Sequence, residues 1–435
     1  MWWVGCVAIP GLIPLVAALA LYFAAWGWLA NRILKKENPW ASLLFLPSSW
    51  VVLEYARAHL FSGLGWNLLA HTQWNWIPVI QLARFTGVWG LSFLVVLVNA
   101  ALCGFLQRKK GAWAGLLLAV LCLLAAWNFG HRITWRPDPT ASDGTRVPGL
   151  KVALLQGNIP QPERWNDAFV ESIWKRYEEL TTAAAAVKAA LIVWPETAIP
   201  DYLEDPAIED RVKGIARSAG TDLLVGAPTE DWETRMPYNT ALLFGRDGEE
   251  RARYSKIHLV PFGEFIPLKP LLGWLKKFYP VADFAPGKEW TVFPTWPAVS
   301  VLVCFEDLFP ELARRFTREG AAWLLVITND AWFGRSAASV QHLQASVFRA
   351  VENGVWVARA GNTGWTGFVD SAGRRLPPPG QVPRFTAEMA VAEIPVVSRR
   401  LTVYTRFGDW FPILCLGLTG LAFIMKSSDG NSRSA

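Results

Sequence analysis

Three side chains that could carry out chemistry stand directly after short apolar runs. Glu196 ends the run LIVWPE, Cys304 ends VSVLVC, and Lys256 lies in YSKIHLVPFGEF, after the run NTALLFG and its hairpin. A thiol with an ordinary pKa of about 8.5 needs a base or a positive neighbour before it can attack as a thiolate. A glutamate that takes its proton and a lysine that stabilises a developing oxyanion would complete a nucleophilic set.

Each residue also has an ordinary interpretation. An acid at a strand end is usually solvated, a lysine usually lies on the surface, and a single cysteine usually packs in a core. The backbone N–H of Phe305, at the expected start of a helix, is a second candidate oxyanion donor. His258 lies two residues after Lys256 and would point to the opposite face of a strand, which disfavours a Cys–His protease.

The segments around these residues alternate between strand and helix patterns. From Leu150 onward, apolar runs such as KVALLQGN and AWLLVITND alternate with helical patterns near 166–187, 205–219, 307–318 and 337–353. This alternation predicts an α/β domain with a largely buried sheet. In such sheets the working groups lie just beyond the carboxyl ends of the strands, where the three residues are expected.

The rest of the chain has the composition of a membrane protein. It is 52% hydrophobic and contains 25 Trp among 435 residues. Candidate membrane spans lie at 7–30, 41–58, 86–106, 113–129 and 410–425, the second weakened by Glu54 and Arg57. The expected domains are a helical transmembrane domain at 1–130, a linker at 131–149, a catalytic domain at 150–400, a last span at 401–426 and a disordered tail at 427–435.

Charge predicts the orientation of these spans. The basic clusters are Arg32/Lys35/Lys36, Arg108/Lys109/Lys110 and the group at Lys426, which the positive-inside rule assigns to the cytoplasm. The 61–85 loop and the segment from about 130 to 409 then face the opposite side. The net charge of +6 is spread over these anchors and the soluble part, without the concentrated basic face of a nucleic-acid-binding protein.

The remaining cysteines and the chain start support the same scheme. Cys6, Cys103, Cys122 and Cys415 lie in or beside spans, where a small apolar role is expected, which leaves Cys304 alone in the soluble domain. The start MWWVGCVAIP has no basic residue before its apolar run and is not typical of a signal peptide. With five spans, Met1 is expected outside the cytoplasm, so we expect the natural reading frame to extend upstream.

The motifs around the three residues resemble a known family. LIVWPET, YSKIHLVPFGEF and VLVCFEDLFP are similar to the Glu–Lys–Cys segments of the nitrilase superfamily, and the membrane spans resemble its membrane-embedded branch, the apolipoprotein N-acyltransferases. Supporting segments are LLQGNIPQPERW, HLVPFGEFIP, ITNDAWFG, SVQHLQASVFRAVENG, RAGNTGWTG and LTVYTRFGDW. The resemblance covers essentially the whole chain, although relatives carry further spans upstream.

The resemblance implies a nitrilase-like α-β-β-α sandwich inserted in a helical transmembrane domain, and a role for each matching residue. Glu196 would be the general base, Lys256 the oxyanion-stabilising cation and Cys304 the nucleophile. Further residues on which the family relies match Trp165, Glu264 and Glu306. Phe305 stands where many members have Tyr, so ring packing could persist there without a hydroxyl.

The implied reaction moves a fatty acyl chain from a phospholipid, through a Cys304 thioester, to the α-amine of a lipoprotein's N-terminal S-diacylglyceryl cysteine. The implied partners are the phospholipid donor, the diacylglyceryl-lipoprotein acceptor and the lipid bilayer, with no metal, cofactor or nucleic acid. The implied location is the bacterial inner membrane, with the catalytic domain on the periplasmic side. The loop FSGLGWNLLAHTQWNWIP (61–78) would form a lipid-guiding rim or pack as an ordinary interfacial loop.

Two other classes stay open at this point. A membrane-anchored nitrilase-type amidase or hydrolase would use the same three residues with water as the acceptor. A catalytically silent membrane scaffold is disfavoured because all three residue types are retained.

Overall fold

The computed structural model describes residues 9–35, 41–109, 111–134, 149–277, 283–396 and 400–425. Predictions on Met1, Cys6, Lys36, Lys110, Lys426 and the tail 427–435 therefore lie outside the described residues. So does most of the predicted linker, because residues 131–134 continue a helix and Gly149 starts a strand. The chain forms two compact units, one of Met1–Pro137, Val351–Gly354 and Leu401–Ala435 and one of Asp138–Ala350 and Val355–Arg400.

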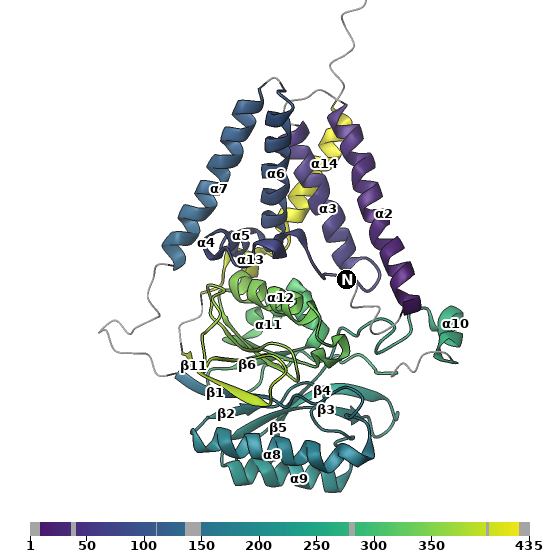
Figure 1. Cartoon of the computed structure of the whole chain (residues 1–435), viewed down its shortest axis with the longest axis vertical. Helices are drawn as coiled ribbons and strands as arrows, with labels where there is room; N and C mark the ends of the chain where they lie inside the picture. Colours follow the sequence, from purple (N-terminus) through teal and green to yellow (C-terminus); the bar gives the residue numbers. More distant parts are fainter. Residues whose placement is uncertain are drawn as a thin grey trace, which may run out of the picture. The chain divides into compact units, whose positions relative to one another are not determined.

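The first unit is helical. Its long helices are α2 (Ile9–Leu34), α3 (Leu46–His59), α6 (Val88–Leu106), α7 (Ala112–Thr134) and α14 (Trp410–Ile424). Short elements are η1 (Ala41–Phe45), η2 (Leu69–Gln73), α4 (Ile77–Ile80), α5 (Ala83–Thr86) and α13 (Val403–Phe407). Helix α3 packs against α2, α6 and α14, which run side by side with it in Figure 1.

Within the described residues, three helical segments are long and apolar enough to cross a membrane: Gly11–Leu34, Val88–Leu106 and Ala112–Thr134. Five spans were expected. Helix α14 is apolar but has 15 residues, and α3 has 14 residues and carries the polar positions that weakened the 41–58 candidate. Glu54 is buried inside the unit, where its carboxylate accepts the backbone N–H of Leu69 at 2.6 Å, whereas Arg57 is half-buried and donates to the Trp66 carbonyl at 2.9 Å. In the loop that follows, Trp66 is buried, as the packed alternative for this loop expects at that position.

The second unit contains two sheets, formed by the strands of the described residues. The first has the order β11-β1-β2-β3-β4-β5 and the second β10-β9-β8-β7-β6. The strands are β1 (Gly149–Gln156), β2 (Leu191–Val193), β3 (Asp222–Glu230), β4 (Pro237–Phe244), β5 (Glu250–Ser255), β6 (Val299–Val303), β7 (Trp323–Thr328), β8 (Trp356–Gly361), β9 (Thr366–Val369), β10 (Gln381–Val382) and β11 (Glu388–Pro395). Each sheet has a parallel core, β1-β2-β3 and β6-β7-β8, with antiparallel strands beside it.

The two sheets pack on each other, and helices cover their outer faces. Strand β1 contacts β8 and β9, and β4 contacts β6. Helices α8 (Val170–Ala186) and α9 (Pro206–Ala219) lie along the first sheet, and α11 (Pro310–Glu319) and α12 (Ala338–Asn353) accompany the second (Figure 1). Short helical turns complete the unit: η3 (Asp167–Phe169), α10 (Lys269–Leu272), η4 (Gly273–Lys277), η5 (Cys304–Leu308) and η6 (Asp330–Phe333). This layering is the predicted α-β-β-α sandwich.

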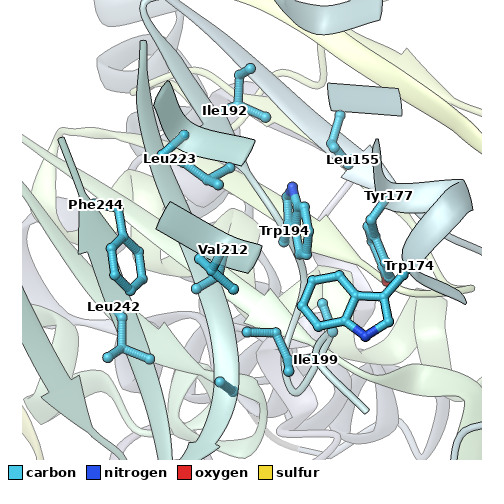
Figure 2. Packing of buried hydrophobic residues seen from close by; sticks show 14 of the residues in the cluster. Leu155, Trp174, Tyr177, Ile192, Trp194, Ile199, Val212, Leu223, Leu242 and Phe244 are labelled. Carbon is cyan, nitrogen blue, oxygen red and sulfur yellow. The ribbon is translucent and has the colours of Figure 1, made fainter. Parts of the chain in front are cut away.

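An apolar cluster fixes α8 and α9 on the first sheet. Figure 2 shows Trp174 and Tyr177 of α8 beside Trp194, which follows β2, together with Val212 of α9. Tyr177 stacks on Trp194 with the ring centroids 4.7 Å apart, and the Trp194 indole N–H donates to the Thr181 hydroxyl at 3.0 Å. Burial of these rings holds β2, and with it the segment that leads to Glu196, in a fixed position.

The predicted strand and helix segments of this unit are confirmed, with one shift in a helix boundary directly after Cys304. The helix expected near 307–318 begins at Pro310, and residues 304–308 form the short 3₁₀ turn η5 instead. Pro310 has no N–H to donate and favours the first turn of an α-helix, which explains the later start. The Phe305 N–H therefore belongs to a tight turn after β6 and gains little from a helix dipole.

Candidate active site

Glu196, Lys256 and Cys304 follow three different strands. Strand β2 ends at Val193, three residues before Glu196; β5 ends at Ser255, directly before Lys256; and β6 ends at Val303, directly before Cys304. The first two strands belong to one sheet and β6 to the other. The candidate site thus draws on both sheets of the sandwich.

Lys256 lies between two carboxylates. Its Nζ is 2.9 Å from Oε1 of Glu264 and 3.6 Å from Oε1 of Glu196. All three side chains are almost fully shielded from solvent, with 1%, 12% and 8% of the Lys256, Glu264 and Glu196 side chains exposed. Burial lowers the pKa of Lys256, but the attraction of Glu264, Glu196 and Cys304 outweighs it and raises the pKa above its ordinary value. Lys256 is therefore a permanent cation at neutral pH.

Backbone and amide donors orient the two carboxylates. The Asn239 side-chain amide donates to Oε1 of Glu196 at 2.7 Å and to Oε1 of Glu264 at 3.1 Å. The second oxygen of Glu196 accepts the Asn329 N–H at 2.8 Å, and that of Glu264 accepts the Val260 N–H at 2.8 Å. Because these donors fix both carboxylates, Glu196 meets an incoming proton donor in one defined orientation.

Arg164 supports the backbone that presents Glu196. Its buried guanidinium donates to the Glu196 carbonyl oxygen at 2.7 Å and also hydrogen-bonds the Thr197 hydroxyl. Thr197 has a positive φ of 42°, a conformation that L-residues adopt at a cost unless their surroundings hold them. Sequence reasoning missed Arg164, Asn239 and Asn329. The rule that polar groups follow strands would have found Asn329, which directly follows β7.

Cys304 occupies a sharp turn. Its φ is +52°, in the left-handed region, and the residue is half-buried. Burial, followed by the charge of Glu196, raises the pKa of the Cys304 thiol well above its usual range, while Lys256 and a hydrogen bond with Thr328 act in the opposite direction. The resting thiol is therefore protonated, and its attack on a carbonyl carbon requires a base such as Glu196.

Glu306 secures the two segments that carry Lys256 and Cys304. It is fully buried, and its Oε1 accepts the Tyr254 hydroxyl at 2.8 Å and the N–H groups of Ile257 and His258 at 2.8 and 3.0 Å. Its Oε2 accepts the N–H of Val303 at 2.7 Å. Burial raises the pKa of this carboxyl and backbone donors oppose the rise. Glu306 therefore contacts the backbone on both sides of the site.

The aromatic residues expected at the site differ in exposure. Phe305 is 7% exposed and meets Phe309 edge-on, with a centroid distance of 5.1 Å. His258 stacks on Phe309 at 3.7 Å, so its ring faces an aromatic neighbour. Trp165 is 52% exposed, with its indole 6.0 Å from the Arg164 guanidinium. Trp165 is thus available for contact with another molecule.

The site's positive charge comes from a side chain. Among the described residues, no group of three or more His, Cys, Asp or Glu side chains is arranged so that it could hold a metal ion. The geometry combines a buried cation, an oriented carboxylate and a thiol on a strained turn, which suits covalent transfer of an acyl group.

Family models match both units of the chain. Residues 151–404 match the carbon-nitrogen hydrolase model, and residues 1–101 match the apolipoprotein N-acyltransferase N-terminal domain. Among solved structures, an amidase of the nitrilase superfamily from Nesterenkonia aligns with a TM-score of 0.46 and 22% identity, over 62% of this chain and 98% of the amidase.

Two similar relatives extend over most of the chain. The apolipoprotein N-acyltransferase of Geobacter metallireducens is 39% identical, over 97% of this chain and 81% of the relative. That of Methylococcus capsulatus is 34% identical, over 96% of this chain and 81% of the relative. At this identity and coverage, together with a match to the family's N-terminal domain, the chain belongs to the apolipoprotein N-acyltransferase family.

Proposed function

We propose that this protein transfers a fatty acyl chain from a phospholipid to the α-amino group of an N-terminal S-diacylglyceryl cysteine of apolipoproteins. The observation that carries the proposal is the buried Lys256 between Glu196 and Glu264, next to the thiol of Cys304. Such a group can form and resolve a thioester without a cofactor.

In the first step, Glu196 takes the proton of the Cys304 thiol as sulfur attacks the ester carbonyl carbon. Lys256 stabilises the negative charge that develops on the carbonyl oxygen. The tetrahedral intermediate collapses with cleavage of the ester C–O bond, and the leaving lysophospholipid oxygen receives the proton from Glu196. The products of this step are a Cys304 thioester and a lysophospholipid.

In the second step, the acceptor's α-amine attacks the thioester carbonyl carbon. Glu196 takes a proton from the amine nitrogen, Lys256 again stabilises the oxyanion, and the C–S bond breaks. The sulfur recovers a proton from Glu196, and the acyl group remains on the nitrogen as an amide. Atoms and charges balance over the two steps, and the free thiol is restored.

Exposed apolar side chains support an acyl-chain substrate. The segment after Lys256 exposes Phe262, Leu268, Leu271 and Trp274 by between 51% and 71%. Soluble proteins rarely gather such side chains on one surface segment unless it contacts a lipid or a partner. We propose that this segment meets the acyl chains of the donor. We place the enzyme in the bacterial inner membrane with the second unit on the periplasmic side, in line with the basic clusters near the helix ends.

We propose the following division of the chain: a helical transmembrane domain at 1–130, a linker at 131–149, a catalytic domain at 150–400 and a last span at 401–426. The roles of Trp165, Glu264, Phe305 and Glu306 in supporting the reaction belong to the same proposal.

The test separates transfer from hydrolysis. Purified protein incubated with phospholipid alone should gain one acyl group on Cys304, which neutral hydroxylamine removes and mass spectrometry detects. Adding a diacylglyceryl-cysteine peptide should discharge the thioester and place the acyl group on the peptide's α-amine. Release of free fatty acid at the same rate with and without peptide would contradict the transferase and favour a membrane-anchored hydrolase. The Cys304→Ala variant is the control for acylation elsewhere.

A further inference from the structure

A buried group of charged residues lies behind the turn that carries Cys304. His342 and Arg349 come from α12, Asp307 from η5, Asp330 from η6 and Arg359 from β8. Each of these residues has 1% or less of its surface exposed. Buried charges at this density are costly unless they are paired and hydrogen-bonded, so their retention next to the nucleophile needs a physical reason.

His342 contacts the nucleophile's own backbone. Its Nε2 is 2.7 Å from Oδ1 of Asp307 and 3.1 Å from the carbonyl oxygen of Cys304. Both neighbours accept hydrogen bonds, so Nε2 carries a proton and donates it whether the ring is neutral or charged. Because a peptide carbonyl is rigidly joined to its Cα, this hydrogen bond restrains the direction in which the Cys304 side chain leaves the turn.

The other ring nitrogen connects to the turn that orients the base. Nδ1 of His342 is 3.0 Å from Oδ1 of Asp330 and 2.7 Å from Nη2 of Arg359. Asp330 directly follows Asn329, whose backbone N–H holds Glu196 at 2.8 Å. One imidazole therefore bridges the turn of the nucleophile and the turn that orients the base.

Arg359 closes the group from the sheet side. Its Nη1 is 2.9 Å from Oδ2 of Asp307, and its Nη2 is 3.3 Å from Oδ2 of Asp330. Ser346 adds a hydrogen bond to Oδ2 of Asp307 at 2.6 Å. These contacts fix the two aspartates relative to β8, so His342 is held at both nitrogens by a rigid frame.

We propose that His342 is a positioning residue for the reaction. It holds the Cys304 turn and the Asn329–Asp330 turn in the relative position that places the thiol against Glu196 and Lys256. It does not touch the substrate. Its effect reaches the chemistry through the Cys304 carbonyl and the Asn329 N–H. The inference rests on the proposed function only in taking Cys304 as the nucleophile.

The charge state of His342 should influence the relative position of the two turns. The groups facing the ring are Asp307 and Cys304 of η5, Asp330 of η6 and Arg359 of β8, with Arg349 on its own helix. Burial and Arg359 lower the pKa of His342, but Asp307 and Asp330 outweigh them and raise it to about 9. When the ring is charged, Nδ1–H can donate to Asp330 at 3.0 Å, and when it is neutral, Nδ1 can instead accept from Arg359 Nη2 at 2.7 Å. Loss of the charge above pH 9 therefore weakens the link to Asp330.

Two substitutions of His342 separate the contribution of Nε2 from that of Nδ1. In His342→Gln the side-chain amide can reach the position of Nε2 and keep a donor for the Cys304 carbonyl, whereas in His342→Asn it reaches only the position of Nδ1. We expect the rate of thioester formation at saturating phospholipid to fall about tenfold in His342→Gln and about a hundredfold in His342→Asn, with little change in KM. The wild-type rate should decline as pH rises through about 9, and that decline should be absent from His342→Gln.

The matched control is Thr317→Val. Thr317 is a fully buried residue of α11 whose hydroxyl donates to the Ala313 carbonyl at 2.8 Å, so its loss lowers stability in the same helical layer without contact to the site. Equal rates and pH profiles for His342→Gln, His342→Asn and wild type would overturn the proposal. The proposal would also be overturned if the rate loss of each His342 variant were explained by its unfolded fraction alone, as is expected for Thr317→Val.

Alkylation keeps this test independent of the acyltransferase activity. The rate at which iodoacetamide modifies Cys304, read by peptide mass spectrometry, should fall in the same order of variants because the thiol loses its alignment with Glu196 and Lys256. If phospholipid never acylates Cys304 yet alkylation follows this order, the proposed function fails and the positioning role stands. Faster alkylation in both variants would indicate an opened site and would overturn the positioning role.

Discussion

The two outer faces of the sandwich are built from different interactions. Under α8 and α9, the first sheet buries aromatic and aliphatic side chains such as Trp174 and Trp194 (Figure 2). Under α12, the second sheet also buries apolar side chains such as Phe348, but it adds the charged side chains of His342, Asp307 and Arg359. Apolar burial is strong but does not depend on direction, whereas ion pairs and hydrogen bonds add little net stability and fix direction closely. The difference indicates that both faces supply stability through apolar burial, and that the second face adds alignment through its charged group.

The largest loss of acyl transfer should come from substitutions of Cys304, Lys256 and Glu196, the three residues that the charged face aligns. Cys304→Ala should abolish acyl transfer because no covalent bond can form. Lys256→Ala and Glu196→Gln should each lower the rate by at least ~10²-fold, through loss of the oxyanion partner or the base. The measurement is acyl transfer to a diacylglyceryl-cysteine peptide, per folded molecule.

A surface lysine is the control for this series. Lys213 of α9 pairs with Glu209 at 2.8 Å on the stabilising face, so Lys213→Ala should leave the rate unchanged. Near-full activity in Cys304→Ala, Lys256→Ala or Glu196→Gln would remove that residue from its proposed role.

A core substitution on the other face should separate stability from activity. Trp174→Ala removes a buried indole that meets Trp194 edge-on at 6.1 Å and should cost about 3 to 5 kcal/mol of unfolding free energy. In a unit of this size the thermal midpoint should fall on the order of 10 °C. Below that midpoint, acyl transfer per folded molecule should stay within about twofold of wild type.

The milder variant Trp174→Phe should have a thermal midpoint between those of the wild type and Trp174→Ala. A hundredfold loss of activity in folded Trp174→Ala would show that the apolar face also aligns the site, and the contrast between the faces would be lost.

The smallest effect concerns pH and the charged face. The pKa of His342 is raised from its ordinary value of about 6.5 to about 9, so its contribution to stability is complete below pH 6.5 and is lost as pH rises through 9. Between pH 7 and 8 the loss should be about 1 kcal/mol. Thermal unfolding in detergent at a series of pH values should show this slope in wild type and a flatter one in His342→Gln. Equal slopes in both proteins would assign the pH dependence to other groups.

The arrangement of strands and helices in the catalytic unit followed from sequence because its signals are local. Apolar runs such as VSVLV and polar residues at strand ends mark β6 and Cys304 without knowledge of their neighbours. The resemblance to the family then identified Glu264 and Glu306 as further candidate site residues. The 3₁₀ turn at 304–308 was missed because Pro310 sets the helix start by a backbone effect that an apolar pattern does not reveal.

The charged group behind Cys304 depends on contacts between distant segments. Asp307 and Arg359 are 52 residues apart, and His342 reads by itself as an ordinary polar position on an amphipathic helix. One signal was present: Arg359 is a lone charge within the apolar run VWVARAG, where a fully buried strand needs a buried partner for it. The sequence marks such a residue as unusual but does not name its partner.

The helical unit is interrupted in the sequence by the whole catalytic unit, and this affects how the protein is made. Within the helical unit, the indole of Trp89 donates to Asp409 at 3.1 Å, and α14 packs on α3, although 320 residues separate Trp89 from Asp409. At about 5–20 residues per second, a ribosome needs on the order of tens of seconds to synthesise that interval. During this time the early helices wait in the bilayer without α14, while the strands of the catalytic unit are translated. The last helix to be synthesised therefore completes the unit that was begun first.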